Sequence, residues 1–75
     1  MLGSQSLSRE QFNRIETEIR VWEAAVPAAP VVTVDIYPSL QKMGVIRVGL
    51  HRAHHDSVWF GATRDGSMIP SAQAA

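Results

Sequence analysis

The chain has 75 residues, and its seven basic and seven acidic side chains give a formal net charge of +0. This length allows one domain with one small core, and the charge balance lacks the basic excess of a dedicated nucleic-acid-binding domain. The chain has no cysteine, which excludes a disulfide framework and a thiolate metal site. Self-association is therefore the remaining common source of extra stability for so small a domain.

The N-terminal segment has neither a basic stretch nor an apolar run, and no stretch approaches the ~20 apolar residues that span a bilayer. We therefore expect a cytoplasmic protein that makes no membrane contact. Along the chain we expect a flexible N-terminus over residues 1–7, a single α+β domain over residues 8–70 and a disordered tail over residues 71–75.

A capping-box pattern predicts the start of a helix, because Ser8 can cap it and Gln11 can complete the box. Leu7 and Phe12 are then placed to form a hydrophobic staple. Apolar residues at spacings of three and four predict one amphipathic helix from Arg9 to about Ala25. Its predicted apolar stripe consists of Phe12, Ile15, Ile19, Trp22 and Val26.

Beyond two prolines the hydrophobic period changes from helical spacing to two, which predicts β-strands. The first strand is expected to end at Pro38, and Ser39 and Gly44 are expected to bound the loop that follows. The second strand comes directly after this loop, residues 53–57 form a turn, and the third strand covers residues 58–64. The predicted inward-facing residues are Val32, Val34, Ile36, Ile46, Val48, Leu50, Val58, Phe60 and Ala62.

Asp65 and Gly66 predict a two-residue hairpin turn that leads into a short fourth strand at 67–69. This turn would place Ile69 on the inward face and Met68 on the outer face. The predicted fold is α+β, with the N-terminal helix packed on one face of a three- to four-stranded antiparallel meander.

The second face of the predicted sheet is the leading candidate for a binding site, because it is more apolar and aromatic than a solvated face requires. A symmetric turn centred on His55 would set His51 beside Trp59 and Gly49 beside Gly61. In a second interpretation, Trp59 only shields these glycines, which would otherwise weaken the sheet. The candidate partner-binding residues are Tyr37, Arg47, His51, Trp59 and Met68.

The turn after the second strand gathers imidazole and carboxylate groups, which are ligands of zinc and related divalent metals. The candidate ligands are His51, His54, His55 and Asp56. Adjacent His54 and His55 point apart in extended backbone, and polar turns commonly collect such residues. We therefore expect no cofactor, and a divalent metal such as zinc at this turn is the alternative.

The turn also contains the residue types of a hydrolase triad, in His54, Asp56 and Ser57. Consecutive residues on one turn do not place an imidazole between a hydroxyl and a carboxylate, so we expect no enzymatic activity.

The sequence favours a small, non-catalytic protein–protein interaction protein, of the adaptor, inhibitor or antitoxin-like kind. We expect it to form a homodimer or to bind another protein through the uncovered sheet face or an edge strand. Stacking of single-stranded nucleic acid on Tyr37 and Trp59 is the alternative use of the same face. The neutral net charge counts against that alternative.

Overall fold

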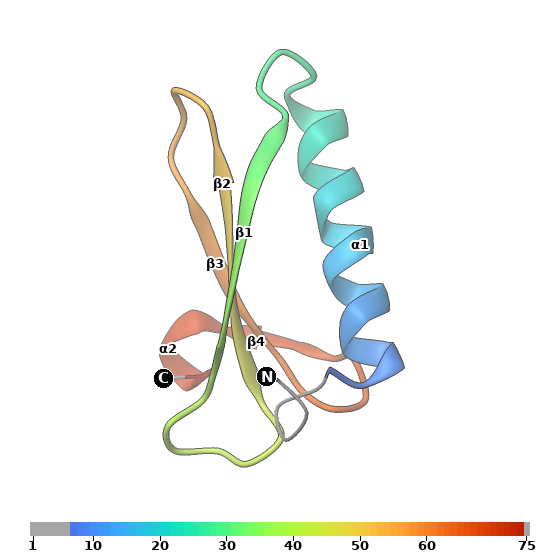
Figure 1. Ribbon diagram of the computed structural model, residues 1–75, viewed down its shortest axis with the longest axis vertical. Coiled ribbons are helices and arrows are strands. Elements are labelled where there is room, and N and C mark those ends of the chain that lie inside the picture. Colours follow the sequence, from blue (N-terminus) through green and yellow to red (C-terminus); the bar gives the residue numbers. More distant parts are fainter. Residues whose placement is uncertain (1–6, 75) are drawn as a thin grey trace.

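The computed structural model describes residues 7–74 and confirms the predicted α+β arrangement of one N-terminal helix followed by antiparallel strands. The four strands form one open sheet in the order β1-β2-β3-β4. Helix α1 lies along one face of this twisted sheet, and the short helix α2 lies on the opposite side (Figure 1). The elements are α1 (Arg9–Ala25), β1 (Val31–Pro38), β2 (Ile46–Arg52), β3 (Val58–Ala62), β4 (Met68–Pro70) and α2 (Ser71–Ala74).

Helix α1 begins with the predicted capping box. The Gln11 N–H donates to Ser8 Oγ, and the Gln11 side-chain oxygen accepts from the Ser8 N–H. The Gln11 side chain is only 2 % exposed, and its amide group also donates to the carbonyl oxygens of Gly44 and Ala62. Gln11 therefore fixes the helix against the sheet, and Phe12, turned about 100° from it, is 52 % exposed. The prediction that Phe12 belongs to the buried stripe is wrong.

The core lies between α1 and the middle strands of the sheet. Ile15 is the buried apolar residue of α1, and Ile19 and Trp22 pack around the core with partial exposure. The inward-facing residues predicted for the second and third strands are confirmed, and Val58, which pairs with Leu50, is half-buried. The buried cluster consists of Ile15, Ile46, Val48, Leu50, Phe60 and Ala62.

A β-bulge changes which valines of β1 reach the core. Val31 pairs with Arg52 and Thr33 pairs with His51, so Val32 is the extra residue between them. Val31 and Val34 consequently pack against the core, while Val32 is 62 % exposed. The prediction that Val32 faces inward is therefore wrong, because simple alternation does not continue through a bulge.

The turn between β2 and β3 is centred on His54 instead of His55. His54 adopts a left-handed backbone conformation with φ of 63°. As a result, Gly49 pairs with Trp59 and Arg47 pairs with Gly61. The predicted pairing is thus wrong by two residues, which leaves every side chain on its predicted face.

The β3–β4 hairpin has a longer loop than the sequence predicts. The Thr63 N–H donates to the Ser67 carbonyl, the Gly66 N–H donates to the Thr63 carbonyl, and Gly66 has a φ of +87°. This is a three-residue loop in which only the glycine is left-handed. The pairing moves by one residue, so Ile69 lies opposite Gly61 and Met68 opposite Ala62. The predicted faces of Ile69 and Met68 are both wrong.

Residues 71–74, which belong to the predicted tail, form the short helix α2 in the structure. Helix α2 packs on β3 and β4, and Ala74 is 0 % exposed. Gly61 has no side chain and leaves room for Ala74 against the sheet. Residues 1–6 of the predicted flexible N-terminus, and Ala75, lie outside the described residues. Among residues 7–74, neither helix combines the length and the apolar character that a membrane crossing needs.

Candidate interaction surfaces

The sheet face opposite α1 brings together four of the five predicted partner-binding residues, and we call them the aromatic face: Tyr37, Arg47, His51 and Trp59. The Trp59 ring is their common neighbour. It stacks on Tyr37 with ring centroids 6.1 Å apart and planes 19° apart, and it forms a T-shaped pair with His51 with ring centroids 5.6 Å apart. The Arg47 guanidinium carbon lies 5.7 Å from the Trp59 ring centroid. Met68, the fifth residue, lies on the other face of the sheet.

Much of the aromatic side of the sheet is covered by the chain itself. A Cβ atom on Gly49 would lie 2.7 Å from the Trp59 ring, so the indole rests directly on this glycine. Ala74 and Ile69 cover Gly61 in the same way. Trp59 therefore shields Gly49, whereas Gly61 is covered by Ala74 of α2 and by Ile69. Tyr37 remains 49 % exposed at the outer border of the face.

His51 is held by two polar neighbours that sequence reasoning did not combine. Its Nε2 atom lies 2.8 Å from Asp35 Oδ2, and its Nδ1 atom lies 2.6 Å from Ser57 Oγ. An acyl-transfer triad also joins a hydroxyl, an imidazole and a carboxylate, but there Nε2 contacts the hydroxyl and Nδ1 the carboxylate, the reverse of the arrangement at His51. Asp35 belongs to β1, so its position beside His51 follows only from the pairing of β1 with β2. The side chains of His51 and Asp35 are 27 % and 39 % exposed, and water at the site weakens the electrostatic stabilisation that such catalysis needs.

The structure does not assemble the candidate metal ligands. His54, His55 and Asp56 are exposed along the turn, whereas both nitrogens of His51 face Asp35 and Ser57. In residues 7–74, no three or more histidine, aspartate or glutamate side chains lie close enough together to hold a metal ion.

Strand β1 is one border of the sheet, and its backbone offers hydrogen-bonding groups on the outer side. The Ser39 N–H donates to the Val45 carbonyl across the β1–β2 pair. Because antiparallel residues alternate between bonded and non-bonded pairs, the N–H and C=O groups of Asp35 and Tyr37 point to β2. The same groups of Val34 and Ile36 therefore point outward. Pro38 also points outward and has no N–H to leave unpaired.

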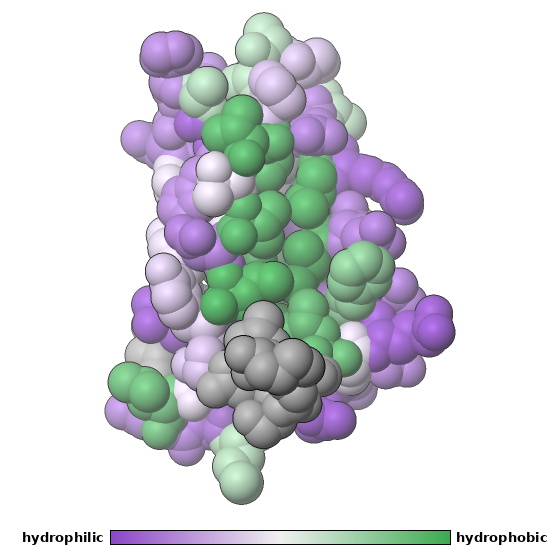
Figure 2. Space-filling model, in the orientation of Figure 1, coloured by the Kyte–Doolittle hydropathy of each residue, from purple (hydrophilic) through white to green (hydrophobic). Residues whose placement is uncertain are grey.

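Exposed apolar side chains border this edge on both faces of the sheet. On the α1 side Ile36 is 41 % exposed, and on the aromatic side Tyr37 is 49 % exposed. The flank of α1 toward β1 is identified by Glu23, whose carboxylate accepts from the Val31 N–H. Phe12 lies on that flank at helical spacing. Figure 2 shows a green hydrophobic band running lengthwise where Figure 1 places β1 and the adjacent side of α1. We call β1 with Phe12 the open edge.

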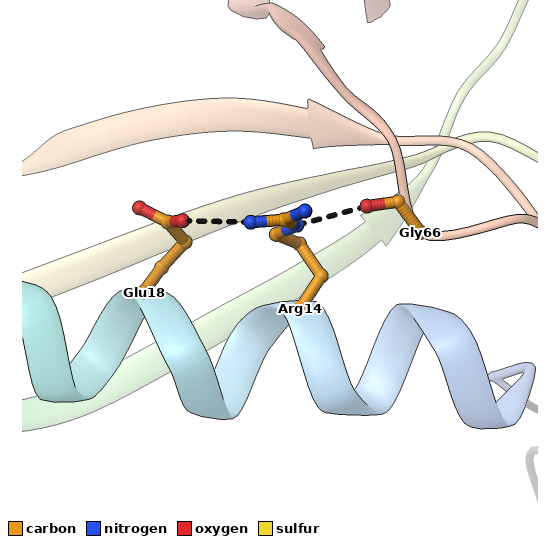
Figure 3. Close-up of polar contacts among 3 residues, drawn as sticks. All are labelled: Arg14, Glu18 and Gly66. Atoms are coloured by element: carbon orange, nitrogen blue, oxygen red, sulfur yellow. Dashed lines mark hydrogen bonds and ion pairs between the residues drawn. The ribbon is translucent and has the colours of Figure 1, made fainter.

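The opposite flank of α1 is closed by polar contacts. Arg14 Nε donates to the Gly66 carbonyl over 2.9 Å and its guanidinium pairs with Glu18 over 3.2 Å (Figure 3). Ser8 Oγ donates to the Arg64 carbonyl at the same hairpin. These contacts tie the first half of α1 to the β3–β4 hairpin, while the second half reaches β1 through the hydrogen bond from the Val31 N–H to Glu23.

Comparisons with protein-family models, with curated proteins and with solved structures give no significant match.

Proposed function

We propose that this chain is a non-catalytic protein–protein interaction protein that binds a second polypeptide by strand addition at β1. In this binding mode, an extended segment pairs with the free backbone groups of a sheet edge, while side-chain contacts on either face give specificity. The supporting observation is that Val34 and Ile36 present outward backbone groups between exposed apolar side chains.

The two borders of the sheet differ in how they are protected. Strand β4 has three residues, ends in Pro70 and is followed at once by α2, which are common ways to block edge pairing. Strand β1 has eight residues, and its bulge at Val32 leaves the stretch from Thr33 to Pro38 regular. An accessible edge of this length is a template for another strand. Helix α2 covers part of the sheet beside the aromatic face. Tyr37 of that face stays exposed next to β1, where it can contact the added strand.

Site-specific photo-crosslinking in the source cells tests this function. A benzoylphenylalanine in place of Val32, which is 62 % exposed on β1, is expected to give covalent adducts with protein. The matched control carries the same group in place of Met43, which is 100 % exposed in the loop after β1. Adducts at position 32 that exceed those at position 43 support strand addition, whether the captured protein is this chain or another. Equal or absent adducts at the two positions contradict it.

A further inference from the structure

We propose that the polypeptide bound at β1 is a second copy of this chain, paired antiparallel with the first about a two-fold axis that passes by Ile36. The inference rests on the proposed function and adds the identity of the partner and the alignment of the two strands. Homodimers most often form through one surface that is complementary to itself, as this arrangement requires.

The backbone limits how two β1 strands can pair. Regular hydrogen bonds join residues whose N–H and C=O groups point outward on both strands, which are Val34 and Ile36. Three alignments meet this condition: Val34 opposite itself, Val34 opposite Ile36, or Ile36 opposite itself. Side chains and the bulge distinguish among them.

Two of these alignments are unfavourable. Pairing Val34 with Ile36 sets Asp35 directly opposite Asp35 of the second copy, and like charges in directly opposed positions destabilise a strand pair. Pairing Val34 with itself brings Ile36 opposite Val32, where the β-bulge interrupts the regular backbone.

The alignment with Ile36 opposite itself avoids both problems. On the α1 side it brings two half-exposed Ile36 side chains together and sets Val34 opposite Pro38 of the second copy. Pro38 has no N–H, but its carbonyl can accept from the Val34 N–H. On the aromatic side it sets Asp35 opposite Tyr37 instead of another carboxylate.

The same alignment also accounts for the apolar side chains at the two ends of β1. Continued beyond Pro38, it brings Leu40 of one copy toward the bulged Val32 of the other. These side chains are 90 % and 62 % exposed in the single chain. A net charge of +0 means that two copies have no overall repulsion to overcome. In this alignment the strand thus pairs its outward backbone groups, avoids opposed like charges and brings apolar side chains together.

Disulfide trapping tests the partner and the alignment together, because the chain has no native cysteine. Residues 35 and 37 would form a non-hydrogen-bonded pair with Cα atoms about 4.5 Å apart, which suits a disulfide. Mixed Asp35→Cys and Tyr37→Cys proteins are expected to shift to a disulfide-linked dimer on a non-reducing gel. Each variant alone should stay mostly monomeric, as should Met43→Cys, the control for random collision.

A second variant keeps the test valid if either substitution disturbs the aromatic face. Ile36→Cys lies on the proposed axis, so this single variant should be joined to itself by a short bismaleimide. Efficient self-linkage of Asp35→Cys overturns the alignment. The proposal that the partner is a second copy is overturned if the wild-type protein sediments as a monomer and none of these variants forms a linked dimer. Photo-adducts of Val32 with another protein would then still support strand addition.

Discussion

Asp65 shows how single residues hold the hairpin that anchors α1. The Thr63 hydroxyl donates to its carboxylate, and the Ser67 N–H donates to the same oxygen over 3.0 Å. These hydrogen bonds, with that of Thr63 the largest cause, lower the pKa of Asp65 from 3.8 to about 2. A lowered folded-state pKa means that the ionised carboxylate stabilises the fold above pH 3.8, and that this contribution is lost as the pH falls toward 2.

Thr63→Val is expected to raise the pKa of Asp65 toward its ordinary value, because it removes the largest of the stabilising hydrogen bonds. Titration of the Asp65 carboxyl carbon by NMR measures the change. In the wild-type protein this carbon should titrate near pH 2, and a wild-type midpoint near 3.8 would contradict the hydrogen bonds assigned to Asp65.

Gln11 explains why the helix was predictable in extent but not in orientation. The capping box and the bounds of α1 follow from local patterns, which the structure confirms. The inward face depends on the bonds from Gln11 to Gly44 and Ala62, which are 33 and 51 residues away in the chain. A glutamine between apolar positions reads as solvent-facing in a local pattern. Because Gln11 is buried with its polar atoms hydrogen-bonded, the helix is turned so that Phe12 lies at the open edge.

Helix α2 has only four residues, and a helix of this length is not stable without tertiary contacts. Its position depends on the glycine beneath it. Gly61→Ala would bring a Cβ atom into Ala74 and to 2.7 Å from Ile69 Cγ1. We expect α2 to detach while the core stays folded, because the core lies on the other face of the sheet.

Amide hydrogen exchange of residues 71–74 measures this detachment. The Gly61→Ala variant should exchange these amides faster than the wild type, with unchanged protection in β2. Wild-type protection of α2 in the variant would show that Gly61 is not what allows it to dock.

The strands show where local patterns succeed and where they fail. Alternation identified the inward residues of β2 and β3, because neither strand contains an irregularity. It failed at Val32 and at Ile69, where a bulge and a three-residue loop each shift the pairing by one residue. Most of the aromatic face was predictable, since the two-residue error at the β2–β3 turn keeps each side chain on its face. Asp35 was missed as a neighbour of His51 because strand alignment alone brings them together.

For the whole molecule, the exposed β1 border of the sheet is the feature on which the proposed function rests. Helix α1 lies on one face of the four strands, and its polar contacts hold its first half close to the β3–β4 hairpin. Helix α2 occupies the other face near β3 and β4. Strand β1 therefore keeps its outer backbone groups and has exposed apolar side chains on both faces. Pairing with a second copy would give β1 a second neighbouring strand, where residues 7–74 supply only β2.

Residue-resolved amide exchange at low and high protein concentration tests the open edge most directly. We expect the Val34 and Ile36 amides to exchange rapidly in dilute protein and to become protected on concentration, as a second copy pairs with β1. The Asp35 and Tyr37 amides, directed at β2, should be protected at both concentrations and act as internal controls. Rapid exchange of Val34 and Ile36 at every concentration would contradict pairing of β1 with a second copy.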